Sequence, residues 1–337
     1  MIFYAPNIHV GGGLELLKSL FGTVNFSSDD IFVLDARLKY TQEVSKLSNV
    51  HYIEPTPIAR FRGELLIKKL AMKQEKIFCF HGLPPLFPSK AEVKVFLQNR
   101  LYIIDFSLRN YPAKVAARLL FEKLIFRIFS ASVDEFIVQS NSMKNALQTY
   151  LGERSTNIVI APFANINRES YIETSSSDKE FDFIYVADDS DHKNHLKLLE
   201  AWSLLAEQGV YPRLALTLPK SSKYKHTIAT LVNNKRCQIH DLGFIPRNEV
   251  NAAYKKAAFL IYPSLVESFG LPLLEASSLG LPIVASELDY VRDVVRPIHT
   301  FNPDSATSIC LAVLRTLGKE HELTRVLTPQ QFVEKIL

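Results

Sequence analysis

The chain has 337 residues, 47% hydrophobic and 22% charged, which is typical of globular proteins, and this length predicts two domains of about 150–170 residues each. Three scattered cysteines argue against a disulfide framework or a zinc site, and the sequence predicts no signal peptide and no membrane span, as for a cytoplasmic protein. Residues 1–170 carry 21 Lys and Arg against 15 Asp and Glu, and the remainder carries 18 against 20. The basic first half either binds an anionic partner, such as lipid headgroups or phosphates, or reflects ordinary surface variation.

In residues 1–165, short β-branched or aromatic runs alternate with longer amphipathic segments. This alternation is typical of βαβ units and predicts a parallel sheet. The predicted strands begin at Ile2, Ile31, His51, Ile77, Val93, Glu135 and Ile158, and the clearest helices cover Leu14–Phe21, Phe61–Gln74, Ala113–Phe129 and Ser142–Tyr150.

A glycine triplet, Gly11-Gly12-Gly13, lies between the first predicted strand and the first helix. Such a loop either brings backbone amides to a phosphate or is a plain strand–helix turn. A dinucleotide fingerprint is not present, because the third glycine of G-x-G-x-x-G would fall at Leu16.

The segment Ala113–Phe129 combines four basic residues with many apolar ones. The spacing of Lys114, Arg118, Lys123 and Arg127 predicts one basic stripe along a helix. Two interpretations remain open: a helix that docks on an anionic membrane surface, or a core helix with a basic solvent face.

A polar, serine-rich stretch, Asn165–Glu180, is the predicted linker, and beyond it the alternation begins again. We therefore predict an α/β fold of two doubly wound domains, residues 1–165 and 178–320, with a final helix over 321–337 that packs back on the first domain. Ligands of such sheets bind beyond the carboxyl ends of the strands. The second set of strands begins at Phe183, Leu214, Cys237, Phe259 and Leu281, with helices that include His195–Glu207 and Arg247–Lys256.

The sequence "SLVESFGLPLLEASSLG" follows the predicted strand "FLIYP". Pro272 suits a first helical turn and Gly280 a helix end, which predicts a helix over about Leu271–Leu279. The free amides at the N-terminus of this helix form an anion site. Because Gly270 has no side chain, a phosphate can approach the backbone there closely. Two carboxylates flank this site, so Glu267 and Glu275 would bind sugar hydroxyls of a nucleotide sugar. Alternatively, the negative charge of Glu275 stabilises the helix through its dipole, and Glu267 is a loop residue at the surface.

The nine residues "ESFGLPLLE", Glu267 to Glu275, resemble the E-x-F-G-x-x-x-x-E hallmark of family-four retaining glycosyltransferases, which have the GT-B fold of two Rossmann-like domains facing across a cleft. The segments "LGFIPRNEVNAAYKKAAFLIYPS" and "GLPIVASELDYVRDVV" on either side are similar to that family too. In the first half, "HGLPPLF" and "FIVQSNSMKNAL" resemble bacterial polysaccharide enzymes.

The resemblance implies a role for each matching residue. Glu267 would hold the transferred sugar, and Lys193 would neutralise the departing diphosphate. Glu275 would hold the ribose. The donor site would consist of Gly12, Gly13, Ile245, Ser264, Phe269, Gly270, Leu271 and Glu275.

The sequence departs from the family at Asp188, where relatives have a second phosphate-binding arginine. His192, His195 or an arginine from elsewhere would have to replace that charge. The acidic run Asp188–Asp191 also permits a metal interpretation, but the resemblance places a phosphate loop there and implies that no metal or other cofactor is needed.

The acceptor-side histidine of many relatives is also absent. Gln98 or Asn99 occupies its place, and His81 lies one strand earlier, as a cleft residue or a turn histidine. A retaining front-face displacement needs no strong base, because the leaving phosphate can accept the acceptor's proton.

The resemblance implies transfer of a sugar from a nucleotide donor to a glycan or a lipid-diphosphate-linked acceptor, in surface polysaccharide synthesis. The protein would be cytoplasmic, peripheral on the membrane through Ala113–Phe129, and without a nucleic-acid partner. A nucleotide-sugar-binding protein without activity and a sugar-nucleotide epimerase are the alternatives.

Overall fold

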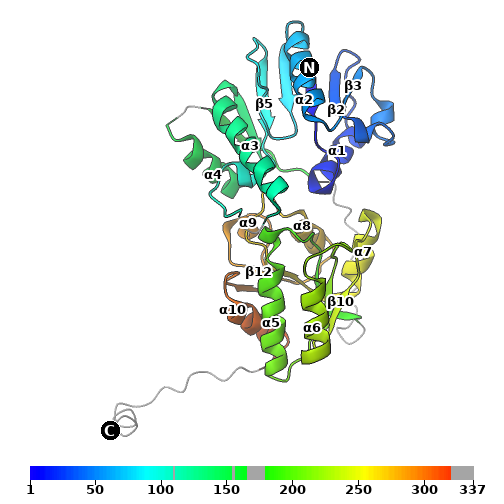
Figure 1. Ribbon diagram of the computed structural model, residues 1–337, viewed down its shortest axis with the longest axis vertical. Coiled ribbons are helices and arrows are strands. Elements are labelled where there is room, and N and C mark those ends of the chain that lie inside the picture. The colour runs from blue at the N-terminus through cyan, green and yellow to red at the C-terminus, as the bar shows by residue number, and fades with distance from the viewer. Residues whose placement is uncertain (109–110, 154–155, 165–178, 320–337) are drawn as a thin grey trace.

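The computed structural model describes residues 1–108, 111–153, 156–164 and 179–319, which form two α/β domains (Figure 1). The first domain contains a seven-stranded parallel sheet in the order β3-β2-β1-β4-β5-β6-β7. Its strands are β1 (Ile2–Ala5), β2 (Ile31–Asp35), β3 (Val50–Ile53), β4 (Lys76–Cys79), β5 (Glu92–Phe96), β6 (Glu135–Val138) and β7 (Asn157–Ile160).

The second domain contains a six-stranded parallel sheet in the order β10-β9-β8-β11-β12-β13. The last of these strands, β13, was not predicted from the sequence. The strands are β8 (Phe181–Tyr185), β9 (Leu214–Leu216), β10 (Ile239–Asp241), β11 (Ala257–Tyr262), β12 (Ile283–Ser286) and β13 (His299–Phe301).

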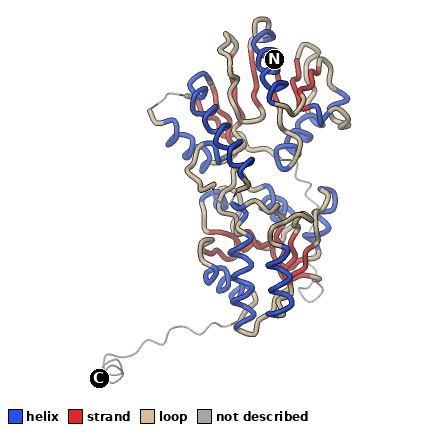
Figure 2. The backbone as a smooth tube through the Cα atoms, viewed as in Figure 1, coloured by secondary structure: helices blue, strands red, loops and turns tan. Residues whose placement is uncertain are grey.

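Helices pack on both faces of each sheet, as Figure 2 shows for the whole chain. In the first domain, α2, α3 and α4 share one core, which contains Ile67, Leu119 and Met143, and α1 covers the opposite face with Leu16 and Leu17. The helices are α1 (Gly11–Thr23), α2 (Pro57–Leu70), α3 (Ala113–Phe129), α4 (Asn141–Leu151), α5 (His195–Glu207), α6 (Lys225–Lys235), α7 (Arg247–Lys255), α8 (Leu271–Ser278), α9 (Asp289–Arg292) and α10 (Ala306–Thr316).

Both sheets reverse their strand order next to the first strand of the domain. The reversal lies between β1 and β4 in the first sheet and between β8 and β11 in the second. A crevice opens at such a point beyond the carboxyl ends of the strands. The glycine loop follows β1, the Asp188–Lys193 segment follows β8, and the Glu267 loop follows β11, so the fold places all three at the crevices.

The two domains meet through hydrogen bonds to the backbone of the first domain. The Ser268 hydroxyl donates to the carbonyl of Gln98 (2.5 Å) and accepts from the amide of Arg100 (3.1 Å). Asp293 Oδ2 accepts from the amide of Ser142 at 2.7 Å. These bonds hold the carboxyl edges of the two sheets facing each other.

Several sequence predictions fall outside the described residues. The final helix over 321–337 lies there, as does most of the Asn165–Glu180 linker. Within the described part of the chain, no helix is long and apolar enough to cross a membrane.

Candidate active site

The N-terminus of α8 opens at the domain junction. Gly270 adopts φ +79°, a left-handed conformation that glycine reaches without a Cβ penalty, and α8 begins at Leu271 with Pro272 in its first turn. Among the described residues, no side chain caps this helix. Pro272 has no N–H and the Leu273 amide donates to the Gly270 carbonyl at 2.9 Å, so the Leu271 amide and the positive end of the helix dipole are available to an anion.

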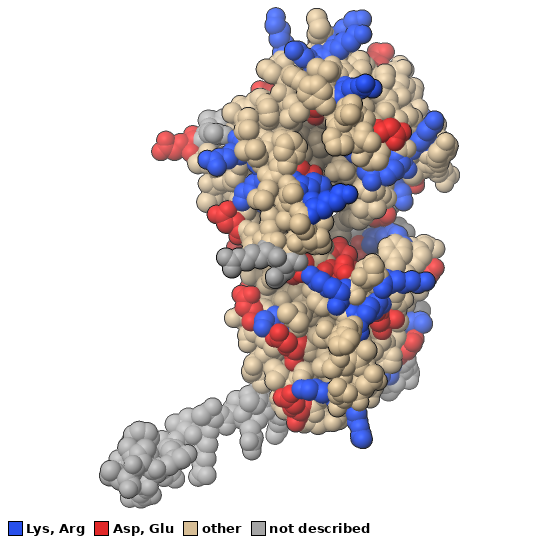
Figure 3. All heavy atoms as spheres, in the orientation of Figure 1, with Lys and Arg blue, Asp and Glu red and all other residues tan. Residues whose placement is uncertain are grey.

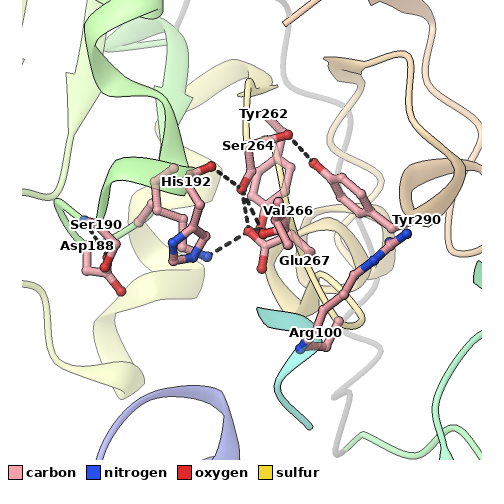
Figure 4. A network of polar contacts seen from close by, with 12 residues as sticks. Arg100, Asp188, Ser190, His192, Tyr262, Ser264, Val266, Glu267 and Tyr290 are labelled. Atoms are coloured by element: carbon pink, nitrogen blue, oxygen red, sulfur yellow. Dashed lines mark hydrogen bonds and ion pairs between the residues drawn. The ribbon is translucent and has the colours of Figure 1, made fainter. Parts of the chain in front are cut away.

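Glu267 lies just before this helix, and three donors converge on one of its oxygens (Figure 4). Lys193 Nζ, the Ser264 hydroxyl and the Tyr262 hydroxyl reach Glu267 Oε1 at 2.7, 2.7 and 2.8 Å. Burial alone would raise the pKa of Glu267, but the Lys193 ammonium, nearby His192 and these hydrogen bonds outweigh it and lower that pKa. The carboxylate is therefore ionised, and its Oε2 makes none of these three bonds and remains available to a ligand.

Lys193 owes its position to the turn that follows β8. A short 3-10 helix, Asp191–Lys193, ends at Asn194, which adopts the left-handed φ of +62°. The Asn194 side-chain amide donates to the carbonyls of Pro263 and Pro303 at 3.1 and 2.8 Å, which holds this turn against the segments that follow β11 and β13. Asparagine suits this position because it tolerates the left-handed region and supplies two donors.

Glu275, one turn into α8, lies at a cleft between the domains. Its side chain is 8% exposed and pairs with Arg247 NH2 of α7, and its Oε2 has no hydrogen-bond partner within the described part of the chain. The cleft has a volume of about 790 Å³ and is lined by residues of α1, α7 and α8. A buried carboxylate with an unused oxygen is expensive unless a ligand donates to it.

The glycine triplet forms the first turn of α1 and is not a separate loop as predicted, and it meets α8 across this junction. Gly12 lies in the first turn of α1, and a Cβ on it would come within 3.0 Å of Leu271 Cδ1. A Cβ on Gly13 would come within 3.0 Å of Gln98 Oε1. The N-termini of α1 and α8 thus lie close together, so two positive helix ends face the same space.

A second cavity, of about 310 Å³, is lined by Glu267. We call it the Glu267 cavity. Asn99 lines it, as predicted for an acceptor-side residue, together with His192, Arg118, Arg100 and Tyr111, which contacts His192 Nδ1 at 2.7 Å. His81 is not among the lining residues. Its Nδ1 lies 3.3 Å from the Tyr4 carbonyl, which fits the turn interpretation.

The histidines near Asp188 do not carry the missing positive charge at neutral pH. Burial lowers the pKa of His195 to about 4, and its Nε2 lies 2.7 Å from the Asp188 carbonyl. Burial and the adjacent Lys193 lower the pKa of His192 as well. Arg100 and Arg118 line the cavity beside Glu267, and Lys18 and Arg247 line the cleft beside Glu275, so these side chains are candidate cations.

The acidic run does not form a metal centre among the described residues, where no three His, Cys, Asp or Glu side chains are grouped to hold an ion. Burial works against ionisation of Asp188, but Lys193 and Ser190 outweigh it and lower the pKa of Asp188. Asp191 pairs with Lys223. Independence from metal stays a prediction.

Two predicted donor residues occupy supporting positions. Ser264 is fully buried and holds Glu267, and Ile245 packs against the core of the second domain. Sequence reasoning missed Tyr262 and Arg247. Tyr262 ends a strand and its hydroxyl turns back to Glu267, whereas Arg247 begins α7 after Pro246. Neither residue stands in a pattern that indicates a site.

Comparisons with known proteins show what the chain is similar to. Residues 167–325 match the family model "Glycosyl transferases group 1". The O-antigen chain mannosyltransferase B of Escherichia coli is 35% identical over 80 residues, 23% of this chain and 21% of that protein. The O-antigen chain mannosyltransferase RfbU of Salmonella typhimurium is 23% identical over 202 residues, 59% of this chain and 55% of that protein.

The chain thus spans less than two thirds of the length of these relatives. Among solved structures, Anabaena Alr3699/HepE in complex with UDP and glucose superposes with a TM-score of 0.66 at 16% identity, over 94% of this chain and 89% of that one. At that identity the likeness concerns the fold. The second half of the chain is thus similar to group 1 of the glycosyl transferases, and the two Rossmann-like domains of the chain form the GT-B fold.

Proposed function

We propose that the protein is a retaining glycosyltransferase that moves a sugar from a nucleoside-diphosphate donor to a glycan or lipid-linked glycan in surface polysaccharide synthesis. The observation that supports this most is the placement of two buried carboxylates, Glu267 and Glu275, on either side of the α8 N-terminus. A diphosphate at the helix end would carry its sugar toward Glu267 and its ribose toward Glu275. The O-antigen mannosyltransferases among the relatives favour a polysaccharide product.

In this proposal, the bond from the anomeric carbon to the diphosphate breaks while the acceptor hydroxyl attacks from the same face. The acceptor's proton passes to the departing phosphate oxygen. Charge on that oxygen is stabilised by the amides of α8, by Lys193 and by Arg100, which lines the Glu267 cavity and takes the place of the missing arginine. Oriented donors at a developing charge contribute about 3–4 kcal/mol each.

The test begins with nucleotide binding. UDP, GDP, ADP and dTDP are screened for a rise in melting temperature, and the nucleotide that raises it is then supplied as radiolabelled nucleotide sugars with lipid-linked acceptors. Glu275→Gln should weaken nucleotide binding about tenfold, because it replaces a charge-assisted hydrogen bond. Glu267→Gln should retain binding and lose turnover.

The alternatives give different outcomes. If no nucleotide stabilises the protein, the donor-cleft assignment is wrong. Nucleotide binding without any transfer would favour a binding protein, and conversion of the donor sugar without an acceptor would favour an epimerase.

A further inference from the structure

The solvent face of α3 is apolar. Leu120, Phe121, Leu124 and Ile128 are 59, 61, 52 and 58% exposed, and their spacing of three and four residues places them along one side of the helix. A helix that only covers a core would turn such side chains inward. The helix packs on the core through Leu119 and Phe126, but its solvent face is apolar as well as basic.

Basic residues lie on the flanks of this apolar face. At 100° per residue, Lys114 and Arg118 lie about 65–105° to one side of its centre and Arg127 about 75° to the other. The predicted single stripe of four basic residues is wrong, because Lys123 turns toward the body of the domain and donates to the Ile104 carbonyl and to Asp105. The result is an apolar strip with a positive border.

Helix α2 has the same kind of surface. Ile58, Phe61 and Leu65 are 69, 53 and 44% exposed, and the neighbouring Arg62 and Lys69 are exposed too. Because α2 and α3 pack on the same face of the first sheet, their exposed sides both point away from it. In Figure 3, blue Lys and Arg atoms border the tan surface of this domain.

The acidic residues of these two helices are withdrawn from the surface. Glu64, in α2, is 8% exposed and accepts hydrogen bonds from Tyr4 and from the Leu86 amide. Glu122, in α3, is 12% exposed and pairs with Arg118 and Tyr102. The exposed side of both helices therefore presents apolar and cationic groups only.

We infer that this α2–α3 face docks on a lipid bilayer that contains anionic headgroups. Apolar side chains flanked by Lys and Arg match a bilayer interface, where acyl chains lie beneath negative charges. A protein partner would have to offer an apolar groove with an acidic border, which is a narrower requirement. Docking itself does not depend on the proposed glycosyl transfer.

One consequence does rest on the proposed function. Arg118 belongs to the docking face and also lines the Glu267 cavity. Docking would bring this cavity beside the membrane surface, where the glycan of a lipid-anchored acceptor is displayed. The substrate class that fits this placement is a saccharide attached to a membrane lipid, with its anionic linkage toward Arg118.

The test measures sedimentation of the full chain with vesicles of phosphatidylcholine alone and with 30% phosphatidylglycerol. Binding is expected only with the anionic lipid and should weaken as salt rises. Lys114→Ala with Arg127→Ala should lower partitioning about thirtyfold, since each basic side chain near an anionic surface contributes about fivefold. Phe121→Ser with Leu124→Ser should lower it at least about tenfold.

Matched control variants lie in the second domain. Lys220→Ala with Lys319→Ala removes the same charge, and Val232→Ser with Ile298→Ser alters side chains that are 38 and 49% exposed. Both controls should bind vesicles like the wild type. All variants should keep the melting temperature that the wild type has without nucleotide, which verifies folding and keeps this test separate from the proposed function.

The inference is overturned if the wild type does not bind anionic vesicles at low salt, or if the control variants lose as much vesicle binding as the α3 variants. It is also overturned if the wild type is a dimer by light scattering and the α3 variants are monomers, since the face would then join two copies. Vesicle binding without any sugar transfer would count against the proposed function alone.

Discussion

Breaking the Lys193–Glu267 pair should destabilise the second domain in a way that depends on pH. The two side chains are 14 and 12% exposed, so Lys193→Met leaves a buried charge without its counter-ion. Such a loss costs about 3–5 kcal/mol. The remaining bonds from Ser264 and Tyr262 retain part of the stabilisation, so we expect a loss of about 2–3 kcal/mol at pH 7.

The sign of the pH dependence follows from the pKa of Glu267, which is lowered in the wild type. The pair therefore contributes stability above the unfolded-state pKa of about 4.3, and this contribution is lost as the pH falls below it. Without Lys193, burial would raise the pKa of Glu267 instead. The deficit of Lys193→Met should then shrink between pH 7 and pH 5, because the carboxyl group becomes neutral.

Urea unfolding of four proteins measures this effect: the wild type, Lys193→Met, Glu267→Gln and the double variant. The double variant should be more stable than Lys193→Met, with a coupling energy of about 2 kcal/mol at pH 7. A coupling energy below about 0.5 kcal/mol, or a deficit that is equal at pH 7 and pH 5, would refute the reasoning.

Three further predictions concern other parts of the chain. Gly270→Ala should lower the free energy of unfolding by about 1–2 kcal/mol and weaken nucleotide binding, because φ is +79° and a Cβ would meet Leu273 Cδ1 at 3.0 Å. Gly209→Ala, at φ +73° in open space, should cost about 1 kcal/mol and leave nucleotide binding intact; equal binding by both variants would contradict the assignment of Gly270. Burial lowers the pKa of His81 to about 3, so His81 should contribute about 1–2 kcal/mol to the fall in stability between pH 7 and pH 5, and His81→Gln should reduce the slope in urea titrations by that amount while the contributions of His192 and His195 remain; an unchanged slope would contradict it. Arg100→Gln should lower turnover about a hundredfold with little change in nucleotide affinity, as measured by single-turnover kinetics; unchanged turnover would exclude Arg100 as the replacement cation.

Much of the fold could be predicted because its strands are short apolar runs between helix-length segments. The errors occur where a capping residue sets a helix boundary and where a strand is too short to show a pattern. The second helix was predicted over Phe61–Gln74, but it begins at Pro57 because the Thr56 hydroxyl caps the Ala59 amide. Strand β13, His299–Phe301, has three residues and two polar-side-chain positions, so its pattern is too short to recognise.

The site was predictable where it follows chain order and unpredictable where it depends on contacts between distant segments. Glu267, Gly270 and Glu275 stand in one recognisable stretch. The convergence of Lys193 and Tyr262 on a single oxygen of Glu267 depends on how β8 and β11 lie side by side. The exposure of Leu120 and its neighbours depends on which side of α3 packs on the sheet. The positions of the basic residues in the sequence do not identify that side.

The domain junction has a consequence for building chimeras. Ser268 and Asp293 of the second domain bind main-chain groups of Gln98, Arg100 and Ser142, so these bonds depend on the path of the first domain's backbone and not on its side chains at those positions. A first domain of unrelated sequence but equal backbone course would satisfy them. Exchange of whole first domains between relatives should therefore preserve these bonds, whereas the contact of Tyr111 with His192 of the second domain also requires the tyrosine side chain.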